Sequence, residues 1–131
     1  MFSHIHVGAR ELERLVVFYD AILSKLGLIQ MPLGNGGSAQ GVGWQYPDSR
    51  WPQFYVQRPV NGLPATWGNG VQVSFFAASQ AQVREVWELA VSQGGTDEGK
   101  PGFREYAPDF YAAYCRDPEG NKLCFVHAVN S

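Results

Sequence analysis

The chain carries an internal repeat at an offset of 68 residues. Five apolar positions of the segment 15–23 fall on apolar positions of the segment 83–91, and His4, in the strand-like segment before the first, falls on Gln72. A period this long corresponds to one supersecondary module per repeat, not to a short solenoid repeat. Two such modules predict one compact domain, in which a polar residue of a shared cleft has a symmetry mate in the other module.

Composition excludes several classes of partner. With 131 residues, of which 45% are apolar and 17% charged, the chain is typical of a globular domain with a real core. The net charge is -2 and no run of Lys or Arg occurs, so we expect no nucleic-acid partner. No apolar stretch approaches the roughly 20 residues that span a bilayer. The first residues have neither a basic start nor an apolar signal core, which favours a cytoplasmic protein.

Two cysteines, Cys115 and Cys124, flank a predicted hairpin turn. They could be neighbours across two strands, but in a chain without an export signal we expect reduced thiols. The simplest interpretation is that both are small apolar residues of a sheet.

Hydrophobic periodicity predicts a β-α-β-β-β order in the first half. Apolar residues recur at helical spacing between Arg10 and Leu26, and Gly27 is able to end this helix in a left-handed conformation. Turn residues separate the strands that follow, at Gly34-Asn35-Gly36-Gly37 and at Pro47-Asp48. The predicted strands are residues 3–9, Leu28–Leu33, Gly41–Tyr46 and Gln53–Arg58.

The second half predicts the same order. Ser79 and Gln82 fit a capping box, which begins a helix that runs to about Gln93. Residues 96–110 are rich in Gly and Pro and predict a long loop with a short strand near 96–99. The predicted strands are Val71–Ala77 and a hairpin of Tyr111–Arg116 with Lys122–Ala128. The fold class is therefore α+β, one domain with modules at 1–58 and 70–131 and a linker at 59–69.

Several short segments carry a family resemblance. They are His4-Ile5-His6-Val7, Phe18-Tyr19, Leu26-Gly27-Leu28, residues 68–73 and residues 117–123. In this order and spacing the chain resembles the vicinal oxygen chelate superfamily, which includes glyoxalases, extradiol dioxygenases and bleomycin- and fosfomycin-resistance proteins. The resemblance covers nearly the whole chain. It implies two sheets curled into half-barrels around a small-molecule cavity, and a homodimer.

The resemblance also implies a set of metal ligands. Its first-strand position is His4, its second-module position is Gln72, and its final-strand position is Cys124, where metal-binding relatives usually have Glu. The repeat places the remaining position near Val56, beside Tyr55 and Gln57. These residues imply a divalent ion such as Zn, Ni, Mn or Fe, or no cofactor at all in a metal-free relative.

The absent glutamate leaves two functions open. Neutral His and Gln donors hold a hard cation poorly without a carboxylate, and a Cys124 thiolate would favour a softer ion such as Zn²⁺. One hypothesis is a metal-dependent lyase or isomerase, or a dioxygenase, that acts on a substrate with vicinal oxygens. The alternative is a metal-free protein that binds and sequesters a small molecule, as resistance proteins of this superfamily do.

Six further assignments follow for individual side chains. His4 and His6 lie two apart on one strand, share a face, and are the catalytic candidates. The candidates for substrate binding are three aromatic residues and one arginine, namely Trp44, Tyr55, Tyr111 and Arg104. Each has a structural alternative, and for His4 and His6 it is that one is merely hydrogen-bonded or that neither is functional. The aromatic residues could be core, Arg104 could pair with Glu105 or Asp109, and Gln72 could be an exposed polar residue of its strand.

Overall fold

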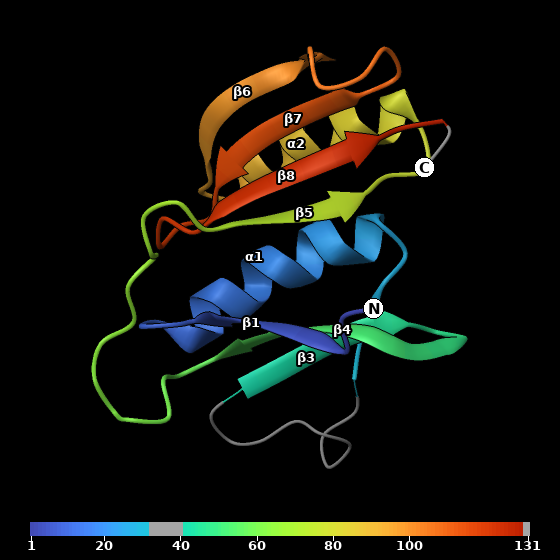
Figure 1. The fold of residues 1–131 in the computed structure, drawn as a ribbon. Helices are drawn as coiled ribbons and strands as arrows, with labels where there is room; N and C mark the ends of the chain where they lie inside the picture. The colour runs from blue at the N-terminus through green and yellow to red at the C-terminus, as the bar shows by residue number, and fades with distance from the viewer. Residues whose placement is uncertain (32–40, 130–131) are drawn as a thin grey trace. The chain divides into compact units, whose positions relative to one another are not determined.

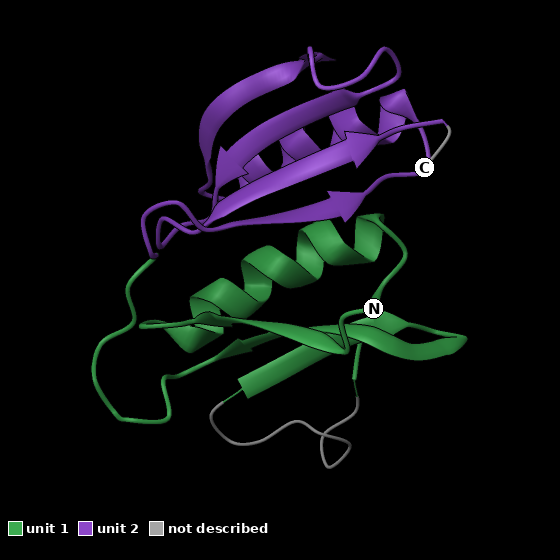
Figure 2. Cartoon of the chain, viewed as in Figure 1, with its two compact units in different colours: residues 1–67 green, residues 68–131 purple. Residues whose placement is uncertain are grey.

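The computed structural model describes residues 1–31 and 41–129 of the chain. It contains two compact units, Met1–Trp67 and Gly68–Ser131 (Figure 2). Each unit consists of one helix packed against a four-stranded mixed sheet (Figure 1). The element order is β-α-β-β-β in both, which confirms the predicted α+β fold of two repeated modules.

Unit 1 contains a sheet with strand order β1-β4-β3-β2. Strand β1 runs parallel to β4, and the other pairs are antiparallel. Its elements are β1 (His4–Gly8), α1 (Leu12–Lys25), β2 (Ile29–Gln30), β3 (Gly41–Tyr46) and β4 (Ser49–Gln57). Strand β2 is shorter than the predicted Leu28–Leu33, because Leu28 and Met31 flank the strand without belonging to it. Residues 32–33 of that prediction, like the predicted turn at 34–37, lie outside the described residues.

Helix α1 ends as the sequence predicts. Gly27 adopts φ 94°, a left-handed conformation that costs glycine little. The Leu28 N–H then donates to the Leu23 carbonyl at 2.9 Å, which satisfies one of the last carbonyls of the helix. The buried residues of α1 are spaced along one side: Leu12, Leu15, Phe18, Tyr19, Ile22 and Leu23.

The core of unit 1 lies between α1 and the sheet. The rings of Tyr19 and Phe54 are 4.9 Å apart, and Trp44 packs beside both. Trp44 is fully buried, and its indole N–H donates to Asp20 Oδ1 at 3.0 Å. The polar atom of this large side chain is therefore satisfied from the helix.

Unit 2 has the equivalent strand order, β5-β8-β7-β6, with β5 parallel to β8. Its elements are β5 (Gln72–Phe76), α2 (Gln80–Ser92), β6 (Thr96–Phe103), β7 (Tyr111–Arg116) and β8 (Lys122–His127). The predicted cap of α2 is present. The Gln82 N–H donates to Ser79 Oγ at 3.0 Å, and the Gln82 side chain accepts from the Ala78 N–H at 2.6 Å.

Strand β6 corrects the prediction of a long loop over 96–110. It runs for eight residues and includes Gly99, Pro101 and Gly102. Two register shifts against β7 accommodate these residues. Because β6 is an edge strand, the missing N–H of Pro101 removes no ladder hydrogen bond from a second neighbour. Gly and Pro therefore indicated irregular pairing here, not the absence of a strand.

The β7–β8 hairpin turn is organised by the buried carboxylate of Asp117. It accepts from the N–H groups of Glu119 and Asn121 at 2.8 and 3.1 Å, and from Asn121 Nδ2 at 2.7 Å. Gly120 takes φ 96° within the turn. The residues that predicted this turn thus form it.

Both cysteines are free and buried. In the β7–β8 register Cys115 pairs with Leu123, whereas Cys124 pairs with Tyr114. The two thiols consequently lie on opposite faces of the sheet. No helix in the described part of the chain is long and apolar enough to cross a membrane.

Candidate functional site

Each sheet has an open face, which we define as the face opposite the unit's own helix. In unit 1 Phe54 and Val56 are buried, so alternation places Tyr55 on the open face. The β1–β4 register pairs His6 with Tyr55 and His4 with Gln53. The open face of unit 1 therefore carries both predicted catalytic histidines and the predicted Tyr55.

The two histidines and the tyrosine form one aromatic cluster. The ring centroids of His4 and His6 are 5.2 Å apart, and His6 stacks on Tyr55 at 5.3 Å. The Tyr55 hydroxyl donates to Gln53 Oε1 at 2.8 Å, and Gln53 Nε2 donates to Gln45 at 3.3 Å. Burial, and then the charge of His4, hold the pKa of His6 below its usual value. His6 is thus kept neutral to lower pH than a free imidazole.

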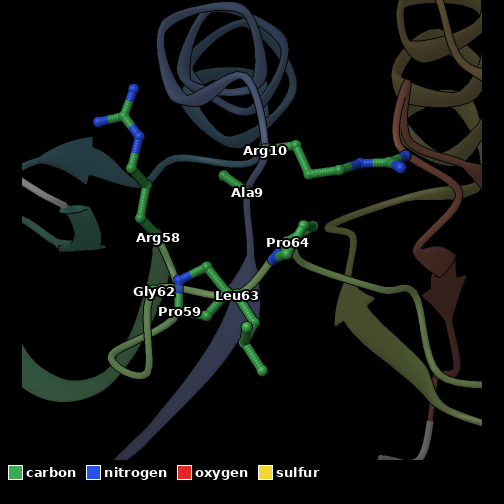
Figure 3. A pocket seen from close by; sticks show the side chains of 7 residues that line it. All are labelled: Ala9, Arg10, Arg58, Pro59, Gly62, Leu63 and Pro64. Carbon is green, nitrogen blue, oxygen red and sulfur yellow. The ribbon is translucent and has the colours of Figure 1, made fainter.

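A pocket of about 400 Å³ lies elsewhere in unit 1, where the segment after β4 folds back over the end of β1. Figure 3 shows its lining of Ala9, Pro59, Gly62, Leu63 and Pro64 together with two arginines. In this view the Arg10 and Arg58 side chains diverge from one another. Arg58 pairs with Glu13 at 3.5 Å. The two charges do not point to one place in the pocket, so this pocket is a weak candidate for a ligand-binding site.

The open face of unit 2 brings a different set of side chains together. The β5–β8 register pairs Gln72 with Lys122 and Ser74 with Cys124. The β7–β8 register adds Tyr114 opposite Cys124. Residues at alternate positions of a strand share a face, so all five side chains lie on the open face.

Cys124 lies at the centre of this set and is 1% exposed. Burial raises the pKa of its thiol. Hydrogen bonds with Ser74 and Tyr114, and the charges of Arg104 and Lys122, lower that pKa in part. Gln72 Nε2 in turn donates to Ser74 Oγ at 3.0 Å. The net effect of burial is to hold Cys124 as a neutral thiol.

A pocket of about 450 Å³ opens on this face. Two cations lie over the ring of Tyr114: Arg104 Cζ is 5.4 Å and Lys122 Nζ is 5.6 Å from the ring centroid. Burial raises the pKa of Tyr114 to about 12, so its hydroxyl keeps its proton at neutral pH. The residues that line the pocket are Gln72, Glu98, Gly99, Arg104, Tyr106, Phe110, Tyr114 and Lys122.

Arg104 is held in place from several sides. Its Nη2 donates to the Lys100 carbonyl at 2.6 Å and its Nη1 donates to the Phe103 carbonyl at 3.3 Å. A Cβ at Gly102 would lie 3.0 Å from Nη1, and a Cβ at Gly99 would lie 3.3 Å from Nη2. The bare backbone of these glycines leaves the space that the guanidinium occupies.

The charge of this pocket is positive. Glu98 is the one acidic residue that lines it, and Arg116 pairs with Glu98 at 2.8 Å. Within residues 1–31 and 41–129, neither Arg104 nor Lys122 forms an ion pair with a carboxylate. The alternative in which Arg104 pairs with a neighbouring acid is therefore not observed in this part of the chain.

Two predicted substrate-binding residues lie on the helix sides of their sheets. Trp44 belongs to the core against α1, as described above. Tyr111 is buried, accepts from Arg84 Nη1 of α2 at 3.2 Å, and packs edge-on against Phe103 at 5.1 Å. Neither ring lies on the open face of its sheet. The alternative that these aromatic residues belong to the core therefore matches where Trp44 and Tyr111 lie.

Sequence reasoning overlooked three members of the unit 2 set as site residues: Ser74, Tyr114 and Lys122. A signal for two of them was present. Ser74 is two residues from Gln72, and Lys122 is two residues from Cys124, so strand alternation places them on the face of the predicted residues. Tyr114 depends on the pairing of β7 with β8, which strand alternation alone does not give.

A solved structure is similar over nearly the full length of both chains. A glyoxalase/bleomycin resistance protein from Albidiferax ferrireducens T118 has 39% sequence identity and a TM-score of 0.81, with 97% of this chain and 98% of the other covered. The chain belongs to the glyoxalase/bleomycin resistance protein family.

Other members of this vicinal oxygen chelate superfamily share the fold at lower identity. A glyoxalase/bleomycin resistance protein/dioxygenase family enzyme from Burkholderia phytofirmans PsJN is 17% identical, with a TM-score of 0.75 over 97% of this chain and 98% of that chain. A lactoylglutathione lyase from Agrobacterium tumefaciens is 19% identical, with a TM-score of 0.63 over 97% and 92%. No family model matches the sequence, and no curated protein matches it.

The donor atoms of unit 2 show whether its residues could hold the divalent metal that the family resemblance implies. Gln72 offers a neutral amide, and burial keeps the Cys124 thiol protonated. A cation there would also meet the charges of Arg104 and Lys122. Within the described ranges, no three His, Cys, Asp or Glu side chains lie close enough together to hold a metal. The unit 2 residues therefore do not fit a divalent cation.

Proposed function

We propose that this protein binds a small organic molecule, without a metal, in the pocket on the open face of unit 2. The observation that carries the proposal is the pair of cations over Tyr114. Tyr114 lies opposite Cys124, which occupies the position where metal-binding relatives usually have Glu. Of the two functions that the sequence left open, this charge favours the metal-free one.

The pocket offers the features that small-molecule recognition requires. Its volume of about 450 Å³ lies within the roughly 300–1,000 Å³ usual for ligand pockets. Tyr106 and Phe110, whose rings meet edge-on at 5.3 Å, supply apolar surface. The Tyr114 hydroxyl and the Gln72 amide supply hydrogen bonds that orient a ligand.

A metal-dependent lyase or dioxygenase is the second candidate, and one observation favours it. His4 and His6 present two imidazoles on one face, with the pKa of His6 lowered, and neutral imidazole is a metal ligand or a general base. This activity requires at least one further ligand for a cation that His4 would hold.

Metal analysis combined with a binding screen tests the proposal. Purified protein is exposed to Zn²⁺, Ni²⁺, Mn²⁺ and Fe²⁺, desalted, and assayed for metal beside the His4→Ala and Gln72→Ala variants. The metal-stripped protein is then titrated with single-ring carboxylates, amides and amines in ¹⁵N–¹H spectra. We expect no stoichiometric metal, and ligand-induced shifts at the amides of Gly99, Tyr114 and Lys122. One ion per chain that is lost in both variants would contradict the proposal.

A further inference from the structure

The charge pattern of the unit 2 pocket narrows the class of ligand that it takes. We propose that the ligand is a small organic acid whose carboxylate or phosphate group lies between Arg104 and Lys122, above the ring of Tyr114. This inference rests on the proposed function and specifies the ligand of the same pocket.

The first argument is electrostatic. Arg104 and Lys122 both line this pocket and lie 5.4 and 5.6 Å from the centroid of the Tyr114 ring, so both charges act on the same pocket. The described residues place no carboxylate in an ion pair with either cation, and Glu98 is already paired with Arg116 at 2.8 Å. Two like charges in one pocket without a counter-ion favour an anion that neutralises both.

The second argument is preorganisation. Hydrogen bonds to the Lys100 and Phe103 carbonyls fix the Arg104 guanidinium, and the bare backbones of Gly99 and Gly102 leave it room. A guanidinium has five N–H donors, and these two carbonyls leave others for a ligand. Since its position is set before binding, little side-chain entropy is lost when an oxyanion docks.

The third argument concerns the other side chains of this face. Cys124, beside Tyr114, is 1% exposed, so its sulfur is shielded from the pocket. Gln72 Nε2 donates one N–H to Ser74 Oγ at 3.0 Å, which leaves its second N–H for a ligand. The edge-on pair of Tyr106 and Phe110 gives the apolar body of the ligand a surface to contact.

Calorimetric titration with matched single-ring probes tests this inference. The metal-stripped protein is titrated with benzoate, phenyl phosphate, the neutral benzamide and the cationic benzamidine, at low and high salt. Arg104→Gln and Lys122→Gln each remove one pocket charge. Arg104→Lys keeps the charge and loses the fork of donors, and Arg14→Gln removes an exposed charge from α1 as a matched control.

We expect at least one of the two anions to bind roughly 10-fold or more tightly than benzamide, and benzamidine not to bind. The preference should fall by roughly 10- to 100-fold in Arg104→Gln and Lys122→Gln, persist in Arg14→Gln, and weaken at high salt. The comparison of benzoate with phenyl phosphate identifies which oxyanion the pocket accepts.

Two results would overturn the inference, and they are distinguishable. Benzamide binding as tightly as both anions, with shifts at the Gly99 and Tyr114 amides, would refute the anion and leave the binding pocket standing. No shift of these amides with any probe would refute the proposed function and the anion together. Thermal unfolding of each variant checks that a loss of binding is not a loss of fold.

Discussion

The two units share a topology and differ in the chemistry of their open faces. His6 is the register partner of Tyr55 in unit 1, and Ser74 is the register partner of Cys124 in unit 2. His6 and Ser74 are therefore equivalent positions, as are Tyr55 and Cys124. In unit 1 the aromatic ring stands on β4, above Gly43 of the adjacent β3. In unit 2 the ring is Tyr114 on β7, beside the small Cys124 on β8. One face thus carries paired imidazoles and the other a cationic pocket.

This contrast shows which part of a repeated sequence the fold constrains. Helix-facing positions must be apolar in both units, because each sheet buries that face against its helix. Open-face positions need only fit the pleat, so their side chains are free to differ. The repeat therefore predicts a common fold and predicts nothing about a common ligand.

The largest expected losses of stability test whether the helix-facing sides of the two sheets are equivalent cores. Phe125→Ala and Phe54→Ala remove rings that are 0% and 3% exposed. We expect each to lower the free energy of unfolding by about 3–5 kcal/mol in urea denaturation. If one of the two substitutions were nearly neutral, the helix sides would not be equivalent cores.

A smaller effect tests how the Tyr55 ring packs over Gly43 in unit 1. A Cβ at Gly43 would lie 2.6 Å from Tyr55 Cε1 and would also meet the methyl group of Met31. We expect Gly43→Ala to cost about 1–3 kcal/mol in the same assay. The matched control is Gly41→Ala, whose Cβ would have Gln57 Cβ and Cγ as its nearest neighbours, both at 3.1 Å, and would therefore be less crowded. Equal losses in the two variants would argue against a packed ring over Gly43.

Thiol reactivity tests whether Cys124, on the open face of unit 2, is uncharged. Burial raises the pKa of Cys115 to about 12 and raises that of Cys124 as well, so neither is a thiolate at pH 7.5. Iodoacetamide should leave both thiols of the native protein unmodified at that pH and modify both after unfolding, as read by mass spectrometry. Rapid alkylation of native Cys124 would indicate a thiolate, and therefore a negative charge near the place where the anion is proposed to bind.

The smallest expected effect concerns the imidazoles of unit 1. The charge of His4 contributes to the lowered pKa of His6, so His4→Gln should raise the pKa of His6 toward 6.5 in an NMR titration. Burial, the larger cause, should keep the pKa of His6 below that value.

The sign of the stability change follows from the direction of this pKa shift. Below 6.5 the unfolded His6 binds more protons than the folded one. The contribution of His6 to the free energy of unfolding is therefore present above pH 6.5 and is lost as the pH falls through the folded-state pKa. An opposite slope that disappears in His6→Gln would contradict the lowered pKa.

Most of the fold could be predicted from local chemistry in the sequence. The helix end at Gly27, the cap at Ser79 and the turn at Asp117 each depend on residues close in the chain, and the structure contains all three. Strand β6 was not predictable in this way, because its pairing with β7 depends on register shifts that absorb Gly99 and Gly102.

The candidate site was only partly predictable for the same physical reason. Gln72, Cys124 and Arg104 were singled out and do meet on one face. Trp44 is an aromatic strand residue like Tyr55, yet it faces α1, because the inward or outward direction of a strand is set by packing. Tyr55 is the register partner of His6, and Cys124 is the register partner of Ser74. The unit 1 equivalent of Cys124 is therefore Tyr55, one residue from the predicted Val56.

The most direct test of the account is a crystal structure of the metal-stripped protein with whichever of benzoate and phenyl phosphate binds more tightly. We predict its anionic group on the open face of unit 2, in contact with both Arg104 and Lys122, and its phenyl ring near Phe110. An anion bound only at His4 and His6, or a divalent ion held by His4 in crystals grown with metal, would contradict the account.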